Sequence, residues 1–197
     1  VVIGTQEWFA ENLRTSTYAN GDPITYISDA GSWAATTSEA HTHYQFAEGF
    51  DGIYGRLYNW YSVSDSRNVC PTDWHVPSNT EFETLFNYLG GASLAGHQLK
   101  EIGYSYWAMT DNNGNYQNIG QSDIRANNNT GFTLLPGGFM GSVGTSAQMS
   151  IWGTLISSTE ANGTSPYSYH FKSLDGAAVQ VTNYTKEYGM SIRCIKD

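Results

Sequence analysis

The chain has 197 residues, of which 40% are hydrophobic, enough for one sizeable core. Only 14% of its residues are charged, and 18 acidic against 9 basic residues give a net charge of −9. Because nucleic-acid binding depends on clustered Lys and Arg, this charge argues against DNA and RNA as partners. No apolar stretch approaches the roughly 18 residues of a membrane span, so we expect no insertion into a membrane.

The N-terminal region predicts short extended segments rather than helices. Residues 1–4 and 8–13 are the extended segments expected within residues 1–30, and Asn20-Gly21-Asp22-Pro23 is a turn signal. Residues 31–51 are small and polar, which predicts a loop. Inside that loop, His41 and His43 would share one face of an extended segment as a possible metal pair. No Cys or carboxylate follows at a ligand-like spacing, so we favour a solvated loop.

The middle of the chain carries the clearest helix signal. The aromatic stretch Tyr54–Tyr61 belongs to the core, either as a strand or as a short buried helix. Ser78 is a good N-cap with Glu81 at the capping-box position, and hydrophobic residues follow at helical spacing up to Gly90-Gly91. A second short helix is expected over Leu94–Ile102.

A long polar excursion follows the predicted helices. Long loops inside compact domains are usually functional. Residues 111–115 place oxygen side chains around Gly114, as calcium-binding loops do, although the distal Glu of an EF-hand is missing and a plain Asn-rich turn is the alternative. We predict a calcium site formed by Asp111, Asn113, Asn115, Asp123 and Glu160.

Beyond Phe132 the pattern is strand and turn, so a small antiparallel sheet is expected. The expected strands cover residues 133–135, 152–157, 167–171, 178–181 and 189–195. Within the last of them, Arg193 alternates with Ile192 and Cys194, which predicts an internal ion pair of Arg193 with Glu11 or Glu160. His75, which lies between Trp74 and Val76, is expected to be a neutral core histidine.

The chain has two cysteines, Cys70 and Cys194. Their positions suggest a disulfide that closes most of the domain, and two buried free thiols are the alternative. A bridge over such a long loop would stabilise the fold by at most about 5 kcal/mol. It would also imply an oxidising compartment, and therefore an extracellular or cell-surface location.

Several motifs point together to one family. In chain order they are Trp8-x-x-Glu11-Asn12-Leu13, Tyr54-Gly55-Arg56-Leu57-Tyr58-Asn59-Trp60, Cys70-Pro71-Thr72-Asp73-Trp74-His75-Val76-Pro77, Gly131-Phe132 with Leu135-Pro136-Gly137-Gly138, Ser157-Ser158-Thr159-Glu160, and Ser191-Ile192-Arg193-Cys194. Over nearly the whole chain this set resembles the Fibrobacter succinogenes major paralogous domain.

The resemblance implies the formylglycine-generating-enzyme branch of the C-type-lectin-like fold. That is an α+β fold with short antiparallel sheets, one or two helices and much loop. Its disulfide commonly joins the region of the first helix to the last strand, where Cys70 and Cys194 fall. We expect one domain over residues 1–197, with residues 1–52 as an N-terminal elaboration. Because the N-terminus lacks the regions of a signal peptide, we expect a mature segment of a longer protein.

In lectin-like relatives the last strands and their loops form the ligand face. Aromatic rings there would offer flat apolar area at low entropic cost, for a sugar or for a peptide side chain. The predicted ligand-binding residues are Trp152, Glu160, Asn162, Tyr167, Tyr169, Asp175, Tyr184 and Tyr188. The alternative is that these tyrosines pack the outer strands.

A looser resemblance links the chain to peptide-binding domains of large calcium-dependent bacterial RTX adhesins. It implies a calcium-dependent binding domain of a secreted or cell-surface adhesin, recognising a peptide C-terminus or a glycan. The related oxidases work through cysteine thiols, and one disulfide would consume both cysteines, so we expect no enzyme activity. A display module without a small ligand is the second hypothesis, and such an oxidase the third.

Overall fold

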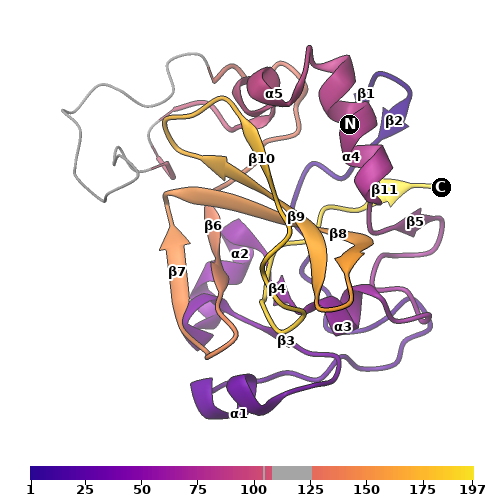
Figure 1. The fold of residues 1–197 in the computed structure, drawn as a ribbon, viewed down its shortest axis with the longest axis vertical. Coiled ribbons are helices and arrows are strands. Elements are labelled where there is room, and N and C mark those ends of the chain that lie inside the picture. The colour runs from indigo at the N-terminus through magenta and orange to yellow at the C-terminus, as the bar shows by residue number, and fades with distance from the viewer. Residues whose placement is uncertain (104, 108–125) are drawn as a thin grey trace.

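A computed structural model describes residues 1–103, 105–107 and 126–197. It has mixed α and β structure with few helices and much loop (Figure 1). The helices are α1 (Ala30–Ala35), α2 (Asp51–Tyr54), α3 (Trp60–Val63), α4 (Asn79–Tyr88) and α5 (Ala92–Leu99), with 3-10 turns at Tyr44–Phe46 and Glu48–Phe50. The strands are β1 (Val2–Ile3), β2 (Gln6–Glu7), β3 (His41–Thr42), β4 (Leu57–Tyr58), β5 (Trp74–His75), β6 (Gly137–Met140), β7 (Ser146–Met149), β8 (Trp152–Asn162), β9 (Ser165–Lys172), β10 (Ala178–Val181) and β11 (Ile195–Lys196).

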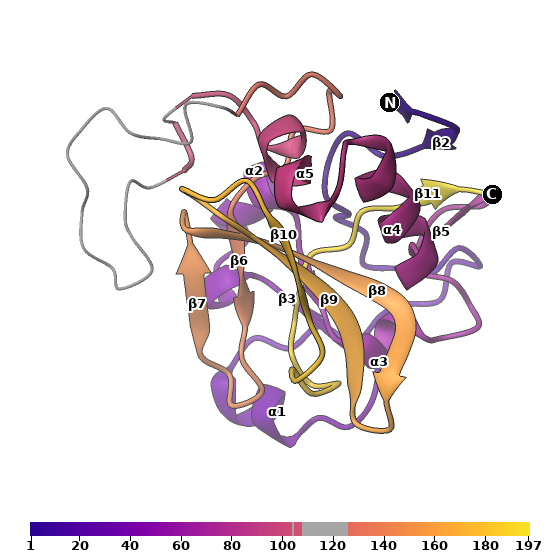
Figure 2. The same cartoon turned by 45° about the horizontal axis from the view of Figure 1, so that its top comes forward.

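The largest sheet is antiparallel, three-stranded and ordered β10-β9-β8. Side chains alternate across its faces, so Leu155, Tyr169 and Phe171 point into one core cluster with α4. Trp152 and His170 lie on the opposite face, since the register pairs His170 with Thr154. Figure 2 shows α4 and α5 at one end of this sheet, with the β6-β7 hairpin beside β8.

Helix α4 has the boundaries that its capping signals predict. The Ser78 side chain accepts from the Glu81 backbone N–H, and the Glu81 carboxylate accepts from the Ser78 N–H, which completes the capping box. Phe82 and Phe86 pack on Tyr169 with ring centroids 4.7 and 4.9 Å apart. Helix α5 starts earlier than expected, directly after Gly91. It also ends earlier, because Lys100 is already extended and forms a bridge with Leu134.

Three expectations for secondary structure are wrong in detail. Residues 133–135, expected as a strand, form only the single bridge of Leu134 with Lys100. Residues 31–51 contain most of α1, together with β3 and two 3-10 turns, because Trp33 is fully buried and anchors this region in a core cluster with Leu57 and Met140. The segment 189–195 makes isolated bridges to Tyr58 and other partners, and only its last residue lies in a strand. The sequence also gave no signal for the β6-β7 hairpin.

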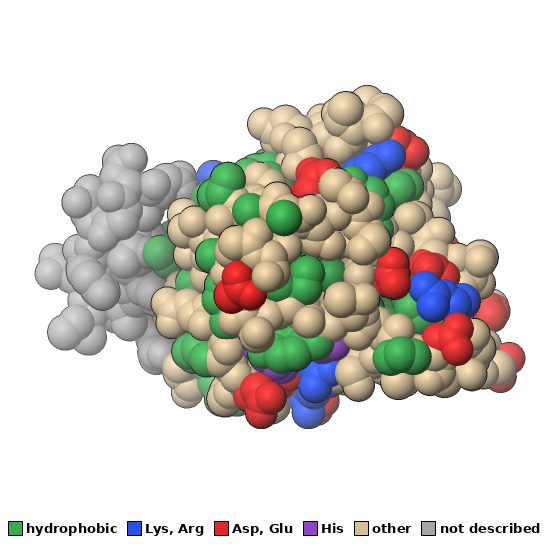
Figure 3. Space-filling view, turned by 90° about the horizontal axis from the view of Figure 1, so that it is seen from below, with side chains coloured by type: hydrophobic (Ala, Val, Ile, Leu, Met, Phe, Trp, Pro, Cys, Tyr) green, Lys and Arg blue, Asp and Glu red, His purple; other side chains and the backbone are tan. Residues whose placement is uncertain are grey.

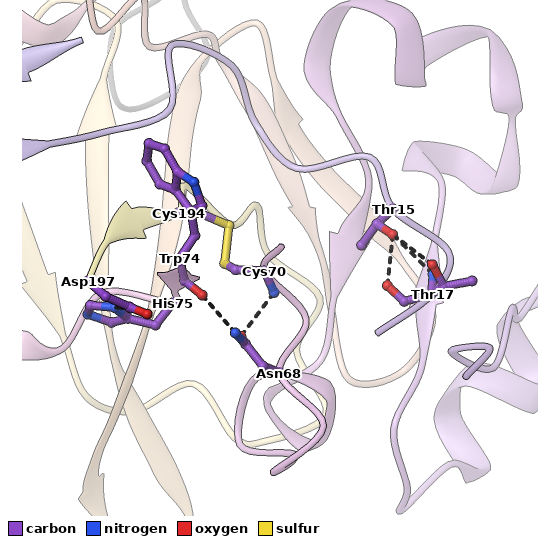
Figure 4. Close-up of a disulfide and its surroundings, with 8 residues drawn as sticks. All are labelled: Thr15, Thr17, Asn68, Cys70, Trp74, His75, Cys194 and Asp197. Atoms are coloured by element: carbon purple, nitrogen blue, oxygen red, sulfur yellow. Dashed lines mark hydrogen bonds and ion pairs between the residues drawn. A yellow bond between two sulfur atoms is a disulfide. The ribbon is translucent and has the colours of Figure 1, made fainter. Parts of the chain in front are cut away.

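The predicted disulfide between Cys70 and Cys194 is present (Figure 4). Both cysteines are fully buried and lie beside the pairing of β5 with β11, in which His75 opposes Ile195. The Asn68 side chain links the backbone at Cys70 to the backbone at Trp74 in β5. It accepts from the Cys70 N–H at 3.1 Å and donates to the Trp74 carbonyl at 2.7 Å. Among the described residues no helix is long and apolar enough to cross a membrane.

Candidate functional site

Five rings from four parts of the chain meet on the face of the large sheet that points away from α4. They are Phe139 of β6, Trp152 of β8, His170 of β9, and Tyr184 and Tyr188 of the loop after β10. We call this set the aromatic face. Period-two alternation places Trp152 and His170 on this side, while Tyr169 and Phe171 point into the core.

The rings of the aromatic face form a continuous series of contacts. Trp152 and His170 have centroids 4.9 Å apart, and Tyr184 follows 5.1 Å from His170. Phe139 lies 5.5 Å from Tyr184, and Tyr188 stacks on Tyr184 at 4.4 Å. His170 is buried, whereas the other four rings are only half-buried and keep accessible surface.

The aromatic face is electrically almost neutral. Burial, assisted by the nearby Lys172, lowers the pKa of His170 to about 4, so its imidazole is neutral at physiological pH. Its buried Nε2 has no hydrogen-bond partner among the described residues. Lys172 places its ammonium 5.5 Å from the Trp152 ring centroid and supplies the nearby cation. Figure 3, seen from below the view of Figure 1, shows hydrophobic side chains dispersed over the surface, with acidic and basic side chains in several small groups among them.

Polar contacts from the β8-β9 hairpin hold the loop that carries the two tyrosines. Glu160 forms an ion pair with Lys186 at 2.7 Å, and the Asn162 side chain donates to the Thr182 carbonyl at 3.2 Å. The Lys186 N–H also donates to the Thr164 carbonyl at 3.2 Å. Two of the predicted ligand residues, Glu160 and Asn162, therefore contact the loop backbone or its lysine.

The remaining predicted ligand residues lie elsewhere. Tyr169 is buried in the core and donates its hydroxyl to Asn79 Oδ1 at 2.7 Å. Tyr167, two positions earlier in β9, is half-buried. Asp175 accepts from the Ala177 N–H at 3.0 Å and shapes its own turn. Of the eight predicted residues, the structure thus brings Trp152, Tyr184 and Tyr188 together.

Comparison with known protein families decides which family this architecture represents. Residues 1–196 match the Fibrobacter succinogenes major domain. The chain belongs to this family. No curated protein and no solved structure matches this Fibrobacter succinogenes major domain. The match confirms the resemblance that the motifs carry, and it leaves ligand and chemistry to be argued from the residues.

Most of the predicted calcium site of this family member lies outside the described residues. This applies to Asp111, Asn113, Asn115 and Asp123. Glu160, the fifth predicted ligand, is engaged by Lys186. Within residues 1–103, 105–107 and 126–197, no group of three or more His, Cys, Asp or Glu side chains has a metal-binding arrangement. The calcium site stays a prediction.

The histidine pair in β3 and at its end is buried rather than solvated. His41 and His43 both pack on Tyr26, with ring centroids 5.4 and 4.8 Å from it. His43 Nδ1 lies 2.6 Å from the Asp51 carboxylate, which also accepts from Arg56 Nε at 2.8 Å. Burial lowers the pKa of His41 to about 4. This environment explains the pair by packing and hydrogen bonding, because no group of three His, Cys, Asp or Glu side chains among the described residues has an arrangement that could hold a metal ion.

His75 is not the neutral core histidine that we expected. It is half-exposed, with Nδ1 2.6 Å from Asp197 and Nε2 2.8 Å from Glu81. Partial burial lowers the pKa of His75, but the hydrogen bonds to Asp197 and Glu81 outweigh burial and raise it overall. Trp74 is likewise half-buried, against Phe9 at 4.5 Å.

The sequence missed Phe139 and His170 as members of the aromatic face. His170 follows the buried Tyr169 in β9, so strand alternation alone would have placed it on the other face. Phe139 belongs to the unpredicted hairpin, and nothing local links it to Tyr184. Their meeting depends on strand register and loop path, which are long-range properties.

Proposed function

We propose that this domain is a non-enzymatic ligand-binding module of a secreted or cell-surface bacterial adhesin, and that the aromatic face is its binding surface. The observation that carries the proposal is the continuous series of rings from Trp152 to Tyr188, all of which except His170 are half-buried. Rings of this kind offer large contact area with little loss of side-chain entropy on binding. The Cys70–Cys194 disulfide is consistent with a secreted protein.

A glycan is the ligand that we favour. Flat ring faces suit the C–H faces of a sugar, and a nearby unpartnered imidazole nitrogen offers a hydrogen bond to a hydroxyl group once the site rearranges around it. Lys172, beside Trp152, would also form an ion pair with the carboxylate of an acidic sugar. An extended peptide remains the alternative ligand, because aliphatic side chains pack on the same rings.

We also propose a C-type-lectin-like fold and a part for calcium in binding. The fold proposal is supported by the disulfide, which joins the segment before α4 to the residue that precedes β11. The calcium proposal is supported by the excess of 18 acidic over 9 basic residues, which supplies oxygen ligands. A binding rather than catalytic role is supported by the absence of free cysteines, since both are in the disulfide.

Glycan and peptide arrays probed with the purified domain test the proposal, once in calcium and once in EDTA. Saturable binding to one ligand class is expected, with weaker binding in EDTA. A parallel thermal unfolding series should show a calcium-dependent rise of the midpoint, because a bound ion stabilises the native state by mass action. No binding on either array would refute the ligand-binding role and favour the display hypothesis. Equal binding and equal midpoints in EDTA would refute the calcium part alone.

A further inference from the structure

Arg193 is a buried cation that holds three distant segments together. Its exposed fraction is 1%. Nε and Nη2 both donate to the Asn12 side-chain oxygen, at 3.1 and 2.8 Å, and Nη1 donates to the carbonyls of Phe9 and Phe132. The expected ion pair with Glu11 or Glu160 is not formed in the part of the chain that the structure describes.

Among the described residues, the guanidinium of Arg193 therefore donates only to neutral acceptors. Burial lowers the pKa of Arg193 to about 9, an effect that the charge of Glu11 partly offsets. A guanidinium carries one N–H more than these hydrogen bonds occupy, and that N–H belongs to Nη2. A buried charge without an opposite charge is destabilising, so an anion that reaches Arg193 would gain a strong interaction.

Arg193 also forms part of the wall of a cavity of about 350 Å³. The cavity lies between the N-terminal segment, α2 and the segment around residue 133. Ile53 and Leu135 give it apolar walls, and Thr133 also lines it. The lining residues include none from the aromatic face.

A second group in the same wall lacks a partner. Glu101 Oε2 is buried and makes no hydrogen bond among the described residues. Burial raises the pKa of the Glu101 carboxyl, so this side chain is protonated more readily than an exposed glutamate. A protonated carboxyl group donates a hydrogen bond to an incoming anion, whereas an ionised one repels it.

We propose that this cavity binds a small monocarboxylic acid with an apolar tail. The ligand carboxylate would accept from Arg193 and from protonated Glu101, and its tail would lie against Ile53 and Leu135. A single negative charge fits better than a phosphate dianion, because Glu11 and Glu101 both belong to the cavity wall. The site would act independently of the aromatic face.

A matched pair of probes tests the proposal. N-acetyl-leucine carries the carboxylate and an apolar tail, and N-acetyl-leucine amide differs from it only in lacking the negative charge. In two-dimensional NMR spectra of the labelled domain, the acid should shift the Arg193 Nε signal and the backbone amides of Ile53 and Thr133 saturably. The amide should leave them unchanged. No saturable shift with the acid, or equal shifts with both probes, would overturn the proposal.

Replacement of Arg193 would disturb its structural hydrogen bonds, so Glu101→Gln is the variant to use. Glu101 should lose its proton as the pH rises. The other titratable groups near it are Tyr54, whose pKa the charge of Glu101 raises, and Tyr106, Glu11, Arg14 and Arg193 of the same cavity lining. At pH values below the pKa of Arg193, the wild-type affinity for N-acetyl-leucine should then fall by about tenfold as the pH rises, while that of Glu101→Gln stays constant. Glu83→Gln, at an exposed glutamate of α4, is the control and should follow the wild type. Loss of binding in Glu101→Gln, or the same pH dependence in all three proteins, would contradict the role of Glu101 and with it the proposed site.

Discussion

Tyr184 and Tyr188 stack face to face, with their ring planes 2° from parallel and their centroids 4.4 Å apart. They lie in the irregular loop after β10, yet Tyr184 also contacts His170 of the large sheet at 5.1 Å. The ion pair between Glu160 and Lys186 fastens the same loop to β8. The two rings are thus held in place before any ligand arrives, which lowers the entropic cost of binding.

Glu160→Gln should separate loop positioning from stability. The ion pair with Lys186 is partly exposed, so its loss should lower the free energy of unfolding by less than about 1 kcal/mol. Affinity for the aromatic-face ligand should fall nonetheless, because the loop that carries Tyr184 and Tyr188 is less constrained. Denaturant titration and ligand titration of the same protein measure the two quantities. An unchanged affinity would show that the ion pair does not position the rings.

The disulfide should carry a large share of the stability. Cys70 and Cys194 close a loop with a sequence separation of 124. The loop-entropy model assigns such a bridge at most about 5 kcal/mol. The double variant Cys70→Ala/Cys194→Ala should therefore unfold at a much lower urea concentration than the wild type. Wild-type protein in reductant controls for the lost sulfur atoms, and a midpoint that is insensitive to both changes would count against this estimate.

His75 should make stability depend on pH in a defined window. Its pKa is raised in the folded state above the unfolded value of about 6.5. The stabilisation by Asp197 and Glu81 is therefore fully present below that value and is lost as the pH rises through the folded pKa. The difference in unfolding free energy between wild type and His75→Gln should shrink across neutral to mildly basic pH. Asp197→Asn should reduce this dependence, and a constant difference would contradict the assignment.

Trp8 and Trp74 should differ in their contribution to the core. Trp8 is fully buried between Phe82 and Phe132, with centroids 5.5 and 5.7 Å away. Trp8→Ala should cost about 3–5 kcal/mol of unfolding free energy, because it leaves a cavity. Trp74→Ala should cost clearly less, since Trp74 is only half-buried on Phe9. Chemical denaturation of both variants measures the two losses of unfolding free energy. A larger loss for Trp74→Ala than for Trp8→Ala would contradict this assignment of core residues.

Local signals in the sequence predicted the parts of the fold that local physics determines. The Ser78 capping box and the spacing of Phe82 and Phe86 predicted α4, and the residues 178–181 predicted β10. The cysteine positions predicted the disulfide. Trp33 shows why residues 31–51 were misjudged, since one buried tryptophan anchors a segment whose composition indicates loop.

The candidate site was predicted only in part, because it depends on long-range register. Residue chemistry predicts Trp152, Tyr184 and Tyr188, but no local pattern indicates that Phe139 and His170 complete the set. Tyr169 was chosen by the same chemistry and lies in the core, since neighbouring positions of a strand point to opposite faces. Residue type suggested the site, and strand register decided which residues belong to it.

The most direct test of the aromatic face is a comparison of dissociation constants for the best array ligand. Wild type, Trp152→Ala, Tyr188→Ala and Tyr88→Ala would be titrated under one condition, with circular dichroism to verify folding. Tyr88 is 66% exposed on α4, outside the aromatic face, and serves as the matched control. We predict at least about tenfold weaker binding for Trp152→Ala and Tyr188→Ala, equivalent to about 1.4 kcal/mol, and wild-type binding for Tyr88→Ala. Wild-type affinity in both folded aromatic-face variants would contradict the account.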